Sequence, residues 1–258
     1  MIEMAIVPRL FMSLKNINDR IPKTLTLLIV VSLLAWSFLF YQHGKMSQMP
    51  MSKGLTWQWQ TSDFIVVYIM WAVMMAAMML PSAMPMIYVF GKTCQKKYGN
   101  DLPFSMLFSS AYLLVWLVFS IALTLLQWQF HNLQWLSSRM ESSHTLVSAA
   151  IFITAGVYQF TAIKNACLNY RRSPLSFLLN FWQNGRWGAF KMGIVHGGTC
   201  VGCCWAQMLI MFAVGVMNIT AMIIITLYVI LEKNSPKNSV LLSKSVGVFL
   251  CLWGVFSF

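Results

Sequence analysis

The sequence predicts an all-α fold, a polytopic transmembrane helical bundle of about seven spans, from three observations. Hydrophobic residues make up 59% of the 258 residues, and the mean hydropathy is +0.68. Charged residues make up only 9%, whereas a soluble domain carries about 25%. Uncharged runs near the roughly 20 residues that cross about 30 Å of hydrocarbon recur along the chain. Because only helices and closed barrels satisfy the backbone in lipid, these runs predict a helical membrane protein.

The uncharged runs predict the spans in order. The first four cover residues 24–41, 64–91, 104–128 and 145–163. A longer uncharged stretch covers 192–231, which as a single helix would measure about 60 Å, twice the hydrocarbon core. We therefore expect a hairpin of two spans with its turn near residues 215–218, where a glycine and an asparagine occur. A seventh span is expected at 239–258, with Lys244 extending to the interface.

The basic residues predict the orientation of the bundle. The chain has 18 Lys and Arg against 6 Asp and Glu, and a net charge of +12. With seven spans, all but Lys45, Lys53 and Arg139 fall on the side of the N-terminus, which the positive-inside rule places in the cytoplasm. We therefore expect a cytoplasmic basic segment at 1–23, a transmembrane domain at 24–258, and an outward 42–63 loop. Basic residues spaced between apolar runs indicate a multi-pass membrane protein, with the lipid bilayer as partner and no nucleic acid.

The fifth span carries a group of thiols behind an imidazole: Cys200, Cys203 and Cys204 follow His196. On a helix these four side chains fall within about 100° of one face. Cys200 lies about 4.5–6 Å along the axis from the other two cysteines, close enough for one metal ion, and His196 with Cys200 forms an adjacent second position. Soft sulfur ligands select Cu(I) above all, with Zn²⁺ as the alternative metal. Inert buried cysteines are the alternative interpretation.

The second span is rich in methionine. Its thioethers form two rows at helical spacing, Met70, Met74 and Met78 in one and Met75 and Met79 in the other. Thioethers need no deprotonation and suit Cu(I) where carboxylates are costly, although packing of the core explains such rows equally well. Pro81 and Pro85 are expected to kink this helix. Because Met78 and Cys203 each lie near the middle of a span, we expect the two sets to meet at the midplane.

Three further methionines, Met46, Met49 and Met51, follow His43 in the outward loop. They resemble the methionine-rich segments with which copper-handling proteins capture the ion, although methionine is abundant in this chain and the cluster is also explained by chance. At the inner ends of spans four and six, Lys164 and Glu232 are expected to mark the boundaries of the hydrocarbon.

Several segments resemble a bacterial family of predicted metal-binding integral membrane proteins of unknown function. The resemblance covers roughly residues 64–235 and is carried by residues 74–86, 158–167, 172–175, 200–206, 212–218 and 231–233. It implies a polytopic membrane fold that binds metal, and one branch of the family is linked to copper delivery to tyrosinase-type enzymes. The positions that match the family pattern are Cys200, Cys203, Cys204, Met78, Met79 and Cys167. The outward methionine cluster is not part of that pattern.

The sequence therefore predicts a copper(I)-binding membrane protein, a chaperone or transporter in copper homeostasis, that transfers or delivers copper across or at the inner membrane. A cuproenzyme or a copper chaperone is the expected partner, and the direction of transfer is open. The sequence contains no phosphate-binding loop, no Ser-His-Asp set and no pair of carboxylates, so no motif in it indicates an enzyme. Two alternatives remain: a thiol–disulfide oxidoreductase that uses Cys200 and Cys203, and a structural assembly subunit whose sulfurs only pack.

Overall fold

The computed structural model describes residues 23–48, 60–133, 135, 145–171, 174–234 and 239–256, and in this part of the chain every regular element is an α-helix. This confirms the all-α prediction. The helices are α2 (Lys23–Gln48), α3 (Thr61–Tyr98), α4 (Leu102–Asn132), α5 (Thr145–Tyr158), α6 (Ala162–Arg171), α7 (Pro174–Phe181), α8 (Gly185–Val214), α9 (Ile219–Asn234) and α10 (Ser239–Phe256).

Five of these helices, α2, α3, α4, α8 and α10, are long and apolar enough to cross a membrane, and α5 with α6 makes a sixth if the bent pair is one span. The chain is therefore a polytopic membrane protein. The predicted sixth span corresponds to α9, which has 16 residues and is about 24 Å long, shorter than the hydrocarbon core. Seven crossings and a cytoplasmic N-terminus accordingly remain predictions.

The long uncharged stretch folds as a hairpin, as predicted. Helix α8 ends at Val214, and Gly215 adopts a positive φ of 107°, which glycine tolerates at no steric cost. Asn218 then begins α9, since its side-chain oxygen accepts a hydrogen bond from the backbone N–H of Ala221 at 3.1 Å, as expected of a helix N-cap. The turn therefore lies where the sequence predicts it.

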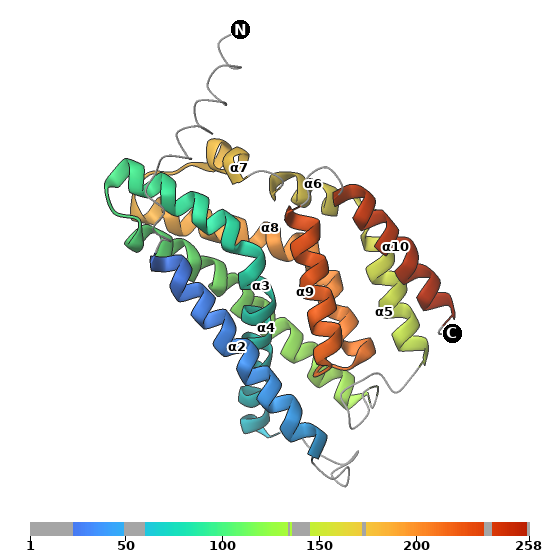
Figure 1. Cartoon of the computed structure of the whole chain (residues 1–258). Coiled ribbons are helices and arrows are strands. Elements are labelled where there is room, and N and C mark those ends of the chain that lie inside the picture. The colour runs from blue at the N-terminus through green and yellow to red at the C-terminus, as the bar shows by residue number, and fades with distance from the viewer. Residues whose placement is uncertain are drawn as a thin grey trace.

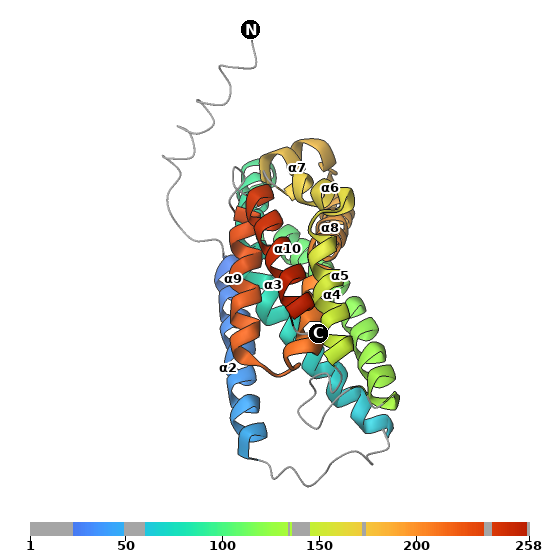
Figure 2. The ribbon, with the colours of Figure 1, turned by 90° about the vertical axis from the view of Figure 1, so that its right-hand side faces the viewer.

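Helix α8 runs through the centre of the bundle, against α4, α5, α6 and α9, while α3 packs against α2, α4, α7 and α9 and α10 pairs with α5. Figure 1 and Figure 2 show the turn between α8 and α9 at the end of the bundle opposite to α6 and α7. The end of α2 reaches that turn, because His43 Nδ1 lies 3.1 Å from the Met217 carbonyl oxygen. At the other end, Lys97 donates a hydrogen bond of 2.6 Å to Asn184.

Helix α3 changes direction near its middle, as Figure 1 shows. Pro81 and Pro85 lie within it. Each proline removes a backbone donor and its ring clashes with the preceding turn, which bends a helix. The predicted kink is therefore present, and it lies beside the methionine rows.

Two glycines one turn apart bring α8 against α4. A Cβ atom at Gly193 would lie 2.3 Å from the carbonyl oxygen of Phe108, and one at Gly197 would lie 2.9 Å from the side chain of Val115. Small residues at this spacing let membrane helices approach closely, where van der Waals contact drives association. This seam fixes the next turn of α8, which carries Cys200, against Tyr112 of α4.

We predict that Gly193→Ala destabilises the protein by about 1–3 kcal/mol, because the added methyl overpacks a contact with backbone that has no room to move. Gly198→Ala is the matched control, since a Cβ at Gly198 meets nothing within 4 Å. Thermal unfolding in detergent micelles measures both variants. Equal unfolding temperatures for the two variants would contradict the close seam.

Candidate metal centre

The three thiols of α8 face the interior of the bundle. The side chains of Cys200, Cys203 and Cys204 are fully buried. The thiols of Cys203 and Cys204 both donate to the backbone carbonyl of Cys200, at 3.1 and 2.9 Å. Helix geometry produces this arrangement, because residues three and four positions apart share one face. The thiols therefore gather on the inner face of α8 and away from lipid.

A single tyrosine connects this face with the methionine helix. The hydroxyl of Tyr112 donates to the Met79 carbonyl oxygen at 3.1 Å and lies 3.3 Å from the Cys200 sulfur. Met79 and Cys200 are each about halfway along helices of 38 and 30 residues. The contact therefore lies at the middle of two helices that are each long enough to cross a membrane.

A lysine also reaches the same cysteine from α9. The Lys233 ammonium donates to the Cys200 sulfur and to the Ser82 hydroxyl, each at 3.0 Å. The sequence predicts Lys233 at the inner end of a span, but its side chain is buried. The ammonium therefore places a positive charge beside the Cys200 sulfur, which is a metal-binding donor type. Helices α3, α4, α8 and α9 therefore all converge on Cys200.

The methionines of α3 line the interior as expected from their spacing. Met74, Met75, Met78 and Met79 are fully buried, and Met70 is half-buried. They belong to the same buried cluster as the three cysteines and as Met208 and Met211 of α8. The donors of α3 and α8 thus share one core.

His196 lies in an aromatic environment. Its ring centroid is 5.4–5.6 Å from those of Phe108, Tyr112 and Phe177. Tyr112 therefore contacts both the imidazole and the Cys200 thiol.

The remaining predicted donors are Cys167 and the methionines at and beyond the end of α2. Met49 and Met51 lie outside the described residues, and of Met46 only the backbone is described, in the last turn of α2. Cys167 of α6 contacts α8 closely, since a Cβ at Gly202 would lie 2.9 Å from its sulfur. Tyr158 donates a hydrogen bond to the carbonyl of the same Gly202. Cys167 of α6 therefore lies beside Gly202, the residue directly before Cys203 on α8.

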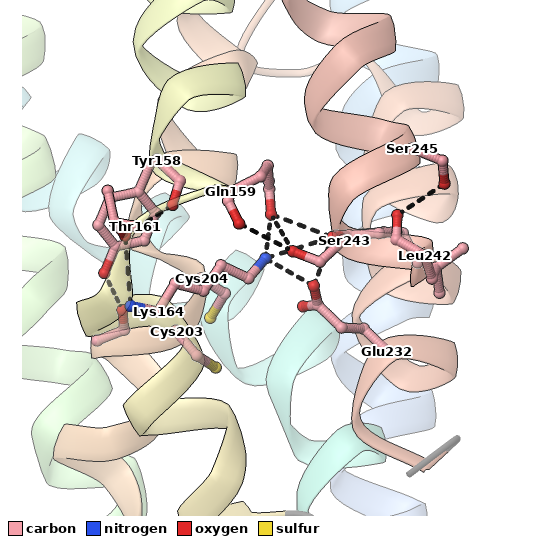
Figure 3. Close-up of polar contacts among 12 residues, drawn as sticks. Tyr158, Gln159, Thr161, Lys164, Cys203, Cys204, Glu232, Leu242, Ser243 and Ser245 are labelled. Carbon is pink, nitrogen blue, oxygen red and sulfur yellow. Dashed lines mark hydrogen bonds and ion pairs between the residues drawn. The ribbon is translucent and has the colours of Figure 1, made fainter. Parts of the chain in front are cut away.

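A buried charged cluster lies beside the thiols, and the sequence analysis missed it. The Lys164 ammonium forms an ion pair of 2.6 Å with Glu232 Oε1, and both side chains are completely buried. Lys164 also donates to the side-chain oxygen of Gln159, and Tyr228 donates to Glu232 Oε1 at 2.5 Å. Figure 3 shows Gln159, Lys164 and Glu232 converging. The sequence predicts these two charges at the boundaries of the hydrocarbon; in the structure their side chains lie inside the bundle and pair with each other.

Helix geometry explains why these charges turn inward. Helices α5 and α6 meet at 60° across residues 159–161, so that Lys164 of α6 folds back toward the bundle instead of continuing toward water. Gln207 of α8 joins the cluster when its amide is oriented to satisfy its neighbours: it donates to the Cys204 carbonyl at 2.9 Å and accepts from Lys164 at 3.0 Å. Breaks in membrane helices and ionisable residues inside the membrane are both typical of functional sites. The break between α5 and α6, close to Lys164, is therefore the feature that could have located this cluster.

Among the residues that the structure describes, no three or more His, Cys, Asp or Glu side chains are arranged to hold a metal ion. The donors at this place are instead thiols together with thioethers, a set that suits a soft monovalent ion of low coordination number and not a hard divalent one. The residues present therefore fit Cu(I) as a transferred ion.

Comparison with known proteins supports this chemistry. No curated protein and no solved structure matches the chain. A family model described as "PpoB2: Copper chaperone" matches residues 68–257, which include α4 to α10, nearly all of α3, and every cysteine in the chain. This confirms the resemblance to a family linked to copper delivery. The chain therefore belongs to the PpoB2 copper chaperone family.

Proposed function

We propose that the protein binds Cu(I) within the membrane, between the cysteines of α8 and the methionines of α3, and transfers it across or at the bacterial inner membrane. The convergence of α3, α4 and α9 on Cys200 carries the proposal, because it places thiol and thioether donors in one dry core. Membership of a copper chaperone family supports copper as the ion. We propose Cys200, Cys203 and Cys204 with Met78 and Met79 as the principal ligands.

The geometry favours Cu(I) over Zn²⁺. Structural zinc takes four Cys or His ligands in a tetrahedron, and the described part of the chain offers no such group of even three. In this part of the chain, the thiols of Cys203 and Cys204 donate only to a backbone carbonyl. These S–H···O bonds are weak, so they break at little cost when the sulfurs rotate toward an ion. Methionine thioethers then complete the coordination of the ion.

Charge explains the role that we assign to Lys233. A thiolate in hydrocarbon needs a positive partner, which the Lys233 ammonium supplies at 3.0 Å. An arriving Cu(I) replaces the proton of a thiol, which leaves to bulk water, so the charge of the site does not change and the Lys233 ammonium keeps its hydrogen bond to Ser82. The ion then needs no carboxylate, which would be costly at this depth.

We propose a relay along the membrane normal. Met46, Met49 and Met51, with His43, capture the ion on the outward side, and Met70 and Met74 pass it to Met78 and the α8 thiols. His196 forms a neighbouring position, and Cys167 is the last donor before the inner surface. With seven crossings and a cytoplasmic N-terminus, this order runs inward; delivery to an outward cuproenzyme reverses it. Transfer by ligand exchange needs no naked ion, because each donor is replaced in turn.

An oxidoreductase mechanism is disfavoured. Cys200 and Cys203 have the spacing of a redox pair, and both are reduced in the structure. Exchange requires a thiolate that a partner can reach, and both side chains are fully buried. We therefore propose that the protein is not an enzyme.

We predict that Cys200→Ser together with Cys203→Ser abolishes stoichiometric copper in the purified protein, because hydroxyls are poor ligands for a soft ion. Elemental analysis of protein loaded with Cu(I) under reducing conditions measures the loss. Cys251→Ser is the matched control, since Cys251 lies on α10 and contacts Gly156 of α5, far along the chain from the proposed ligands. Full copper retention by the double variant would show that the metal binds elsewhere.

We predict that Met78→Leu with Met79→Leu weakens Cu(I) affinity by at least about tenfold, or about 1.4 kcal/mol, because leucine fills the same volume without a donor atom. Such volume-conserving exchanges cost less than about 1.5 kcal/mol of stability, so the fold is retained. Competition with a Cu(I) chelator measures the affinity. Met106→Leu on α4, whose side chain is 46% exposed, is the control and leaves the affinity unchanged. Unchanged affinity in the double variant would mean that these methionines only pack.

A further inference from the structure

The buried ion pair of Lys164 and Glu232 has no role in holding copper, and its placement is costly. Both side chains are completely buried, and taking two charges out of water costs several kcal/mol per ion, which pairing offsets only when the geometry is excellent. Ionisable residues inside transmembrane segments commonly mark ion pathways and proton relays. The pair therefore calls for a function beyond packing.

We propose that Glu232, held by Lys164, is a proton-binding site that couples copper transfer to a proton gradient. Within the described part of the chain, Oε1 of Glu232 accepts from Tyr228 and pairs with Lys164, while Oε2 is buried without a hydrogen-bond partner. A proton bound at Oε2 satisfies this oxygen, which otherwise lacks a donor among the described residues. The proton leaves bulk water and forms one O–H bond at Oε2, while the Lys164 ammonium gives up its ion pair and keeps its hydrogen bonds to the Gln159 and Tyr228 oxygens.

The groups around Glu232 come from five helices. Helix α6 supplies Lys164, and Gln159 follows the last residue of α5. Helix α10 supplies the Ser243 hydroxyl, which donates to Gln159 at 3.1 Å. Helix α9 adds Tyr228. Helix α8 contributes two titratable groups beside the cluster, the thiols of Cys203 and Cys204, which Figure 3 shows in the same view. Helix α9 also carries Lys233, whose ammonium donates to Cys200. Helix α5 carries Tyr158, whose hydroxyl donates to the Gly202 carbonyl. Lys164 is thus the cation that directly balances the Glu232 carboxylate.

Protonation of Glu232 reaches the copper site through α9 and α8. It removes the negative charge that holds Lys164, so that α6 and α9 lose their ionic link. Glu232 is followed directly by Lys233, whose ammonium contacts Cys200, so a movement of α9 shifts that ammonium relative to the thiol. Gln207 connects Lys164 with the backbone of Cys204. Two contiguous routes therefore join the proton site to the thiols, as coupling between sites requires.

This inference rests on the proposed transfer function, and the test separates the two. The double variant Lys164→Met/Glu232→Gln removes both charges and keeps similar volumes, so no unpaired charge remains buried. Each single variant leaves one unpaired charge and is expected to unfold at a lower temperature than the double variant. Asp63→Asn is the control for a carboxylate outside the cluster, since Asp63 lies in the first turn of α3.

The first measurement is infrared difference spectroscopy of the copper-free full chain in lipid as the pH is lowered. Only six Asp and Glu residues are present, so the band of a carboxylic acid in an apolar environment is readily assigned. We expect this band in the wild type and in Asp63→Asn, and its loss in the double variant. A band that persists in the double variant, or no such band in the wild type, would overturn the proton site regardless of any copper measurement.

The second measurement uses proteoliposomes that contain a Cu(I)-chelating dye, with Cu(I) supplied outside as its acetonitrile complex. For one coupled proton we expect the initial transfer rate of the wild type to change by up to about tenfold per unit of imposed pH difference. The double variant binds copper in full, and its rate does not respond to the gradient. A gradient response equal to that of the wild type overturns coupling. A wild type that binds no copper would instead refute the proposed function. The infrared band would still show whether Glu232 binds a proton.

Discussion

The absence of water inside the helical bundle is the constraint on which the rest of the structure depends. In hydrocarbon, a polar or charged side chain without a partner costs several kcal/mol. Lys164, Glu232 and Lys233 are buried in this chain, so helices α3, α6, α8 and α9 must approach one another closely enough to satisfy them. The ion pair of Lys164 and Glu232 and the contacts of Lys233 with Ser82 and Cys200 meet that requirement. The polar contacts therefore select one arrangement among the many that apolar packing alone would allow.

Sequence reasoning predicted the elements that depend on local chemistry. Apolar runs and helical periodicity predicted the helices, the hairpin turn at Gly215, the kink at Pro81 and the inward faces of the cysteines and methionines, because each follows from spacing within one segment. The resemblance to a metal-binding family also proved correct. The sequence shows where charge begins after the sixth predicted span, and α9 continues past that point to Asn234.

Contacts between segments could not be predicted in the same way. Lys164 and Glu232 are 68 positions apart, and an ion pair between them becomes visible only once the break at 159–161 turns α6 inward. Counting Lys164 and Lys233 as surface charges was reasonable for orientation, but their side chains are buried. Likewise, the spacing of Cys200 and His196 shows that they share a face and not that Tyr112 contacts both. A single sequence contains no signal for such long-range contacts except the cost of an intramembrane charge.

The charges and sulfurs together suggest why a copper-handling protein keeps lysines at this depth. A site made only of neutral thioethers binds Cu(I) without a change in charge elsewhere, and it would hold or release the ion by affinity alone. A thiolate balanced by Lys233 adds a second state, in which the ammonium occupies the position that the ion takes when it arrives. In one state the ammonium contacts Cys200 and in the other the ion does, so small movements of α9 select between them. The ion pair between α9 and α6 lies one residue from that lysine, where it controls such movements most directly.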